Sequence, residues 1–203
     1  MNIVLSYIGE LPKYILYCLY QIRLYSKLPI YLIYNDYSSS YLDIIQKKFN
    51  VFLVKYNEYN KSNFNILNKY KNNFLIVHNL GKRKELFFRS FERFYLLNNF
   101  MDKNSIINVL FLEIDNLIYQ DPSEWISVLE NHEIAFMIDN KNRVSTGISY
   151  FKNSKSVKKL INYFDNDYLK NIKNIKCPSE MGAIYYFIKI IKIVVLFYRH
   201  IMT

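Results

Sequence analysis

Short apolar runs alternate with amphipathic segments in the first part of the chain. Residues 2–8 (NIVLSYI), 29–36 (PIYLIYND) and 51–56 (VFLVKY) are short and apolar, as buried strands are. Between them, the apolar positions of residues 12–26 and 41–49 recur at helical spacing. The pattern therefore predicts three strands separated by two helices.

The same alternation continues beyond a segment rich in Asn and Lys, residues 57–73, which we expect to be the least structured part of the chain. Further strands are predicted at 74–79 (FLIVHN), 108–114, 133–139 and 145–151, and helices at 84–101, at 122–131 and after 151. Strands that alternate with helices favour the α/β class, with a mostly parallel sheet flanked by helices. Scarce Gly and Pro leave no linker, so we expect a single domain over residues 1–203.

Two carboxylates follow the most apolar strand, in the stretch NVLFLEIDNLIYQDP. Glu113 and Asp115 are two residues apart, so on an extended chain they point to the same side. Carboxylate oxygens suit hard cations such as Mg²⁺ or Mn²⁺, and ligands of α/β sheets bind beyond the carboxyl ends of the strands. The alternative is that Asp115 and Asn116 only end the strand with turn chemistry. The spacing alone leaves both readings open.

The predicted helix 84–101 carries two arginines one turn apart. Arg89 and Arg93 have guanidinium groups that match the oxygens of a diphosphate. They also fit an ordinary solvated helix face on which Glu92 is the partner. By themselves, the two arginines favour this second reading.

Two further positions are candidates for contact with a ligand. Gly147, after Thr146, either lets the backbone approach a ligand closely or marks a bulge in a strand. Glu180 begins a predicted helix, where a carboxylate interacts favourably with the helix dipole, and in a cleft it would be a candidate base.

Composition narrows the functional class. The chain has a net charge of +10, which favours nucleic acid, an anionic membrane surface or a phosphorylated substrate as partner, or simply a solvated face. The sequence contains no Walker loop, no GxGxxG, no GxSxG and no zinc-ligand spacing. Two cysteines make no disulfide framework, so we expect a reducing compartment and a cytoplasmic location. The apolar stretch 183–198 is interrupted by Lys189 and Lys192 and is shorter than a membrane span.

Taken in order, these segments resemble the glycosyltransferases of the GT-A fold, a Rossmann-like α/β fold, as found in bacterial and large-DNA-virus proteins. The resemblance covers roughly residues 2–187. It is carried by five segments, namely IVLSYIGELPKYILYCLYQIRLYSKLPIYLIYND, FFRSFERFYLLNNFM, VLFLEIDNLIY, TGISYFKN and SEMGAIYYF. VLFLEIDNLIY resembles the strand that ends in the family's Asp-x-Asp motif.

The resemblance implies transfer of a sugar from a nucleoside-diphosphate sugar to a glycan or other hydroxyl acceptor, with Mn²⁺ or Mg²⁺ as cofactor and no nucleic acid as partner. It also implies a role for each matched position. Tyr7 and Asp36 would lie near the base and ribose, and Arg93, with Arg89 less securely, would face the pyrophosphate. Asp115 would bind the metal, and Glu113 would contact the metal, the donor ribose or the sugar. Thr146 and Gly147 would border the sugar, and Glu180 would be the base at the acceptor hydroxyl.

The sequence departs from the family in two places. The motif is Glu-x-Asp, which puts Glu113 in doubt as a direct metal ligand. The tail after about residue 187 does not resemble the family's usual ending, so we expect a chain truncated there and a C-terminal segment suited to peripheral membrane contact. Two alternatives stay open: a degenerate GT-A fold with a binding or scaffold role, and a basic nucleic-acid-binding domain.

Overall fold

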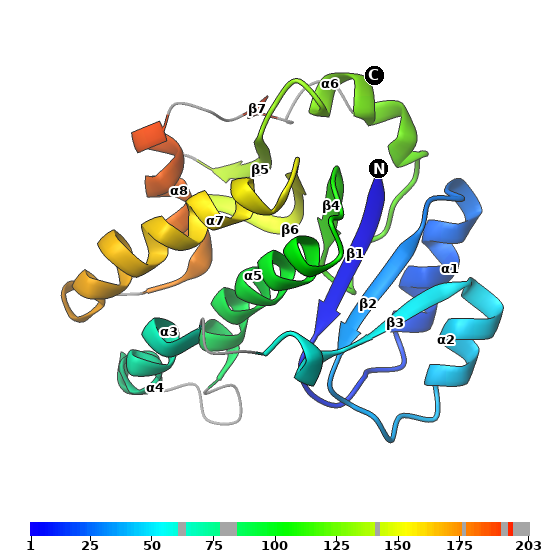
Figure 1. Cartoon of the computed structure of the whole chain (residues 1–203), viewed down its shortest axis with the longest axis horizontal. Helices are drawn as coiled ribbons and strands as arrows, with labels where there is room; N and C mark the ends of the chain where they lie inside the picture. The colour runs from blue at the N-terminus through cyan, green and yellow to red at the C-terminus, as the bar shows by residue number, and fades with distance from the viewer. Residues whose placement is uncertain (61–63, 78–84, 141–142, 176–177, 192–194, 197–203) are drawn as a thin grey trace.

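One seven-stranded sheet forms the centre of the molecule (Figure 1). The computed structural model describes residues 1–60, 64–77, 85–140, 143–175, 178–191 and 195–196. The strand order is β3-β2-β1-β4-β6-β5-β7. The strands are β1 (Asn2–Tyr7), β2 (Ile30–Tyr34), β3 (Val51–Lys55), β4 (Val109–Leu112), β5 (Ile134–Asn140), β6 (Arg143–Phe151) and β7 (Val195–Leu196).

Most neighbouring strands are parallel, as the alternation of strands and helices predicts. Strand β1 pairs in parallel with both β2 and β4, although β4 is about a hundred residues away in sequence, and β2 pairs in parallel with β3. Strand β6 is antiparallel to its neighbours β4 and β5. The carboxyl ends of β1, β2 and β4 therefore meet at one edge of the sheet, where ligands of α/β sheets bind.

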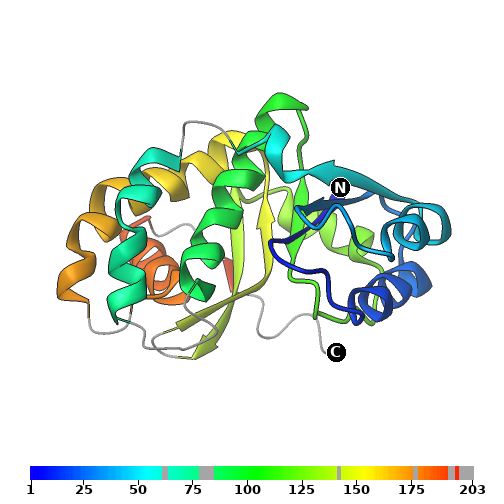
Figure 2. The same ribbon diagram turned by 90° about the horizontal axis from the view of Figure 1, so that it is seen from below.

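Helices cover both faces of the sheet (Figures 1 and 2). The first face carries α1 (Ile15–Tyr25) and α2 (Leu42–Phe49), and the second carries α5 (Leu86–Lys103), α7 (Ser154–Tyr163) and α8 (Glu180–Ile191). The remaining described helices are η1 (Tyr56–Glu58), α3 (Asn65–Lys69), α4 (Lys71–Val77), η4 (Pro122–Trp125), α6 (Ile126–Leu129), η5 (Phe164–Tyr168) and η6 (Leu169–Asn174).

Strand β4 is apolar at every position because both of its faces are covered. Val109 and Phe111 belong to the core on the α5 side, whereas Leu110 and Leu112 belong to the core on the α1 side. A strand between two layers of helices has no solvent-facing side and reads as a continuous apolar run. This burial fixes the position at which Glu113 leaves the sheet.

Helix α5 crosses the second face and is fixed by aromatic packing. The Phe94 ring packs edge-on against Phe111 of β4, with centroids 5.8 Å apart, and the Phe91 ring packs against Phe164 at 4.8 Å. Edge-to-face pairs of this kind restrict orientation as well as burying apolar area. The arginines of α5 are consequently held at fixed places relative to the end of β4.

Two expectations about secondary structure were wrong. In the Asn- and Lys-rich stretch 57–73, most of the described residues are helical, because they include α3 and the beginning of α4. The described part of the predicted strand 74–79 belongs to α4, and residues 78–79 lie outside the described residues. An isolated apolar run does not distinguish a strand from a buried helix. The predicted helix 122–131 is present as two consecutive helical segments, η4 and α6, which end at Leu129.

The described helices include none with both the length and the apolar character needed to cross a membrane. Much of the C-terminal stretch 183–198 belongs to α8, which ends at Ile191. Residues 192–194 and 197–203 lie outside the described residues, so the expected truncation and C-terminal membrane contact stay predictions.

A buried hydrogen bond between α5 and η5 gives a test of the helical layer. Tyr95 donates to the Asp165 carboxylate at 2.6 Å, and both residues are buried. Burial raises the pKa of Asp165 above its usual value of 3.8, while the Tyr95 hydrogen bond and Lys158 partly oppose this rise. Removing the hydroxyl therefore raises that pKa further.

We expect Tyr95→Phe to lower the free energy of unfolding by about 2 kcal/mol near neutral pH. Because a raised carboxyl pKa means that the folded state retains a proton more strongly than the unfolded state, this deficit should shrink as the pH falls toward 4. Urea denaturation at several pH values measures it. A deficit that is the same at every pH would contradict the assignment.

Candidate active site

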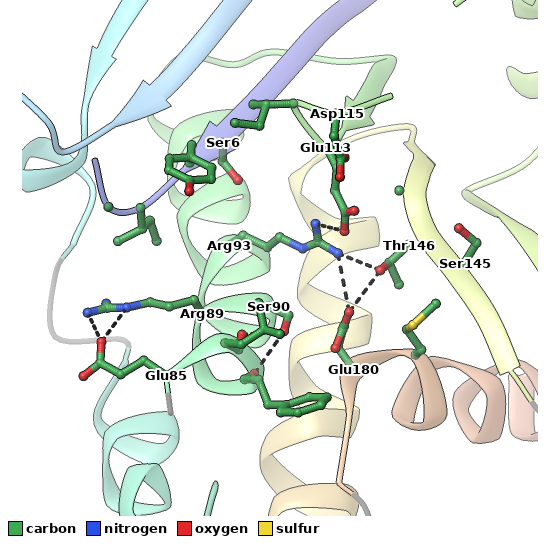
Figure 3. A pocket seen from close by; sticks show the side chains of 18 of the residues that line it. Ser6, Glu85, Arg89, Ser90, Arg93, Glu113, Asp115, Ser145, Thr146 and Glu180 are labelled. Atoms are coloured by element: carbon green, nitrogen blue, oxygen red, sulfur yellow. Dashed lines mark hydrogen bonds and ion pairs between the residues drawn. The ribbon is translucent and has the colours of Figure 1, made fainter. Parts of the chain in front are cut away.

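A cavity of about 710 Å³ lies at the edge of the sheet where β1, β2 and β4 end (Figure 3). The starts of α5 and α8 and the middle of β6 complete its wall. Eight of the nine residues that the sequence singled out line this cavity. They are Tyr7, Arg89, Arg93, Glu113, Asp115, Thr146, Gly147 and Glu180.

Asp36 is the ninth residue, and it is not part of the cavity lining. Its carboxylate accepts hydrogen bonds from the Leu11 backbone N–H at 2.9 Å and from the Ser38 hydroxyl at 3.1 Å. The neighbouring Asn35 lines the cavity instead, and its side-chain oxygen accepts from the Gly9 N–H at 2.7 Å. The two side chains together fix the loop between β1 and α1.

Gly9 gives that loop a conformation that other residues rarely adopt. Its φ is +133°, a region open to glycine. The loop leads to Tyr14, which lines the cavity together with Tyr7. Burial, followed by the proximity of Tyr7 and of the Asp115 carboxylate, raises the pKa of Tyr14. Two tyrosine rings thus lie beside the acidic motif.

Arg93 is the centre of a buried polar cluster. Its Nη1 donates to Glu113, its Nη2 donates to Thr146 Oγ1 at 2.6 Å, and Nη2 lies 3.7 Å from Glu180 Oε1 (Figure 3). Thr146 donates in turn to Glu180 at 3.1 Å. One guanidinium group therefore joins α5, the end of β4, β6 and the start of α8.

Aromatic rings complete the surroundings of this guanidinium group. The Phe94 and Phe111 centroids lie 5.3 Å and 5.8 Å from its central carbon. Its Nε is buried and has no hydrogen-bond partner among the residues that the structure describes. The group is thus fixed by two carboxylates, one hydroxyl and two rings rather than free to turn toward solvent.

Arg89 belongs to a second network on the wall of the cavity. It donates to Glu92 at 2.6 Å and to Glu85 at 2.7 Å, and Glu85 also pairs with Lys71 of α4 at 3.0 Å. Glu92 is buried and accepts from the Tyr56 hydroxyl at 2.7 Å. Burial, and then this hydrogen bond, raise the pKa of Tyr56. Glu92 is thus the partner of Arg89, as expected for the surface-helix alternative. The Glu92 side chain is buried, however, and Arg89 is only partly exposed, so the pair does not lie on a solvated face.

Gly147 lies in a bulge of β6. The register of β6 against β5 shifts between Ser149 and Ser145, so residues 146–148 are extra on β6. Bulges redirect side chains, and they are common beside active sites. Here the bulge places Thr146 against Arg93 and Gly147 in the cavity wall.

Asn116, which the sequence analysis read only as a turn former, fastens this bulge to the acidic motif. Its side-chain amide donates to the Gly147 carbonyl at 2.9 Å, and a Cβ at position 147 would lie only 2.9 Å from the same amide nitrogen. The backbone carbonyl of Asn116 accepts a hydrogen bond from the Cys18 thiol at 3.2 Å. Burial, and secondarily Asp115, raise the pKa of Cys18 to about 12, so the thiol stays protonated.

Glu113 and Asp115 differ in their surroundings. One oxygen of Glu113 accepts from Arg93, whereas no hydrogen bond or ion pair from a described residue reaches the exposed Asp115 carboxylate. No group of three or more His, Cys, Asp or Glu side chains with metal-binding geometry occurs among the described residues. A site in which a hard cation is completed by substrate oxygens and water needs only one or two protein carboxylates. Asp115, and secondarily Glu113, fit such a site.

The sequence analysis missed several other cavity residues. Ser6, Ser90, Ser145 and Met181 line the cavity. They lie one to three residues from Tyr7, Arg93, Thr146 and Glu180, so the flanks of the motifs were the available signal. Glu85 was also overlooked: its i,i+4 spacing to Arg89 was an available signal, whereas its contact with Lys71 is not visible in the spacing.

The Arg93 cluster predicts a large effect on stability. We expect Arg93→Ala to lower the free energy of unfolding by about 3–5 kcal/mol, because Glu180 would remain buried without its cation. Adding Glu180→Gln to Arg93→Ala should recover part of this loss, because the substitution removes the unpaired charge. Urea denaturation of the two single variants and the double variant measures the coupling. Losses that simply add would exclude the cluster.

Comparison with known proteins gives structural neighbours. No protein-family model matches the chain, and no curated protein matches it. The PaToxG glycosyltransferase is similar, with a TM-score of 0.54, 16% identity, and coverage of 93% of this chain and 69% of that one. GlyE of Streptococcus pneumoniae TIGR4 is similar in its apo form, with a TM-score of 0.59, 15% identity, and coverage of 96% and 44%. A second GlyE structure is similar with a TM-score of 0.58 and 14% identity, and the match covers 96% of this chain and 45% of that one.

The chain thus spans less than half the length of the GlyE chains that it matches. At these identities the similarity establishes the architecture. Helices flank the mostly parallel sheet as the sequence analysis expected, and the neighbours are glycosyltransferases. This chain has their fold.

Proposed function

We propose that this protein transfers a sugar from a nucleoside-diphosphate sugar to a hydroxyl acceptor, such as a glycan, with Mn²⁺ or Mg²⁺ as cofactor. The observation that carries the proposal is the Asp115 carboxylate. It has no described partner and lies in the main cavity of a glycosyltransferase fold, beside Glu113, which Arg93 holds in place.

The half of the cavity formed by β1 and the loop before α1 suits the nucleoside. Tyr7 and Tyr14 offer aromatic rings beside the acidic motif, and Asn35 lies at the same edge. Aromatic side chains bind bases through stacking. In this proposal Asp36 acts through the loop, because its carboxylate is occupied by Leu11 and Ser38.

The carboxylates of the acidic motif would hold the cation and the diphosphate. A bound Mn²⁺ or Mg²⁺ supplies positive charge that stabilises the departing nucleoside diphosphate. Asp115 is the ligand on the protein side. Glu113 keeps one oxygen on Arg93 and has the other for a metal-bound water or a sugar hydroxyl. Arg93 holds Glu113 in position behind the motif, so that the carboxylate is preorganised for its role.

Glu180 is the candidate base on the acceptor side. It lines the cavity at the start of α8, and Thr146 and Arg93 fix its position. A reaction that inverts the sugar configuration requires a base at the acceptor hydroxyl, and a retaining reaction does not. Glu180→Gln would accordingly abolish transfer in the first case and reduce it only moderately in the second.

The proposal is tested by calorimetric titration of uridine and guanosine diphosphates into the protein, with and without Mn²⁺. We expect binding of at least one nucleotide that strengthens with Mn²⁺, and a loss of at least tenfold in that metal-dependent affinity for Asp115→Asn, because the amide is a weaker ligand for a hard cation. Asp43→Asn is the matched control, since Asp43 is exposed and pairs with Lys47 on the surface of α2.

Turnover is measured separately, as release of nucleoside diphosphate from a panel of nucleotide sugars. Metal-dependent binding without release would indicate a donor-binding protein of this fold. Absence of nucleotide binding to the wild type, or equal binding by Asp115→Asn, would refute the proposal.

A further inference from the structure

Helix α1 is apolar on the side that faces away from the protein. Ile15, Cys18, Leu19 and Ile22 of its inner side are buried in the core. On the outer side, Tyr17, Tyr20 and Leu24 are 64%, 54% and 56% exposed. An ordinary surface helix carries charged or polar residues there. This outer side therefore has the composition of a contact surface.

A groove between α1 and α2 continues this apolar surface. Its volume is about 400 Å³, and its apolar lining includes Leu16 and Phe49 beside the exposed rings of α1. Ile44 of α2 also lines the groove and is 41% exposed. Lys13 and Lys48 line the groove, one from each side, and none of the described residues that line it is acidic.

A neighbouring loop extends the exposed band on the other side of α1. Gln21 donates to the Ile118 carbonyl at 3.0 Å and thereby holds the loop against the helix. The residues on either side of Ile118, Leu117 and Tyr119, are 46% and 69% exposed. Exposed large apolar residues on three separate elements thus adjoin one another, which marks an interaction surface.

The charges on this surface favour an anionic partner. Lys13 and Lys48 line the groove, and the nearest acid on α2, Asp43, is already paired with Lys47 at 3.1 Å. A second copy of the chain is disfavoured, because a two-fold symmetric contact would place this lysine-bearing surface against itself. Tyrosine and lysine together are typical of the water–membrane interface, where the rings lie at the headgroups and the ammonium groups reach the phosphates.

We propose that the α1–α2 surface, formed by Lys13, Tyr17, Tyr20, Leu24, Ile44 and Lys48, binds an anionic lipid bilayer. The tyrosine rings and Leu24 enter the headgroup region, and the lysines contact lipid phosphates. Tyr14, next to Lys13, lines the cavity of the candidate active site, so one wall of that cavity lies close to the proposed membrane surface. The two helices lie at one end of the molecule, away from α5 and α7 (Figure 2).

Vesicle co-sedimentation tests this proposal with the full chain. We expect sedimentation with vesicles that contain phosphatidylglycerol as well as phosphatidylcholine, weak binding to phosphatidylcholine alone, and a decrease with added salt. Lys13→Gln/Lys48→Gln should lower the partition coefficient by about tenfold or more. Tyr17→Ser/Tyr20→Ser/Leu24→Ser should lower it on the same vesicles by removing the inserted groups.

Two sets of controls separate this surface from general charge and exposed aromatic groups. Lys155→Gln/Lys158→Gln removes two exposed lysines of α7, and Phe52→Ser removes an exposed ring of β3. Both should bind vesicles like the wild type. Circular dichroism and thermal unfolding show whether each variant is folded.

Three results would overturn the proposal. The first is a wild type that fails to sediment with the anionic vesicles at low salt. The second is binding that the α1–α2 variants leave unchanged. The third is a dimer in analytical ultracentrifugation that the Tyr17/Tyr20/Leu24 variant abolishes, since a second copy would then cover the surface. None of these measurements depends on nucleotide binding.

Discussion

The burial of the Arg93 guanidinium group is the constraint around which the site is arranged. A buried cation must be paired, and here the partners come from three other elements: Glu113 after β4, Thr146 on β6 and Glu180 on α8. Because each partner is attached to a different part of the fold, the cluster exists only when α5, the sheet and α8 are packed together. The core on the α5 side and the site therefore form together during folding.

The cluster also assigns different tasks to two acidic residues that look equivalent in sequence. Glu113 forms an ion pair with Arg93. Asp115, two residues later, lines the cavity and has no partner among the described residues. A glutamate at position 113 fits this arrangement, because its side chain reaches a guanidinium group that is anchored on α5. Position 113 thus has a structural contact that position 115 lacks among the described residues.

Much of the fold could be predicted from the sequence because local pattern and burial agree. Strands β1 to β4 are short apolar runs bounded by helices, and the Phe residues of α5 fall on one side of a helix. Prediction failed at 74–77, where an apolar run of strand length is helical and its packing decides the outcome. It also failed to find the Lys71–Glu85 ion pair, because that contact joins two separate helices. Asp36 was placed at the ligand edge by its position after β2, but the direction of its side chain is set by the loop that it holds.

The contact between Asn116 and Gly147 has a consequence for how such a sequence can change. The amide of Asn116 occupies the space that a side chain at 147 would need, and the same amide holds the Gly147 carbonyl. A larger residue at 147 is admissible only after position 116 has become smaller, yet a smaller residue at 116 leaves that carbonyl without its donor. The two positions are therefore expected to change together during evolution. A sequence with only one of the two changes has either a steric clash at 147 or a carbonyl without its hydrogen-bond donor, and is less stable.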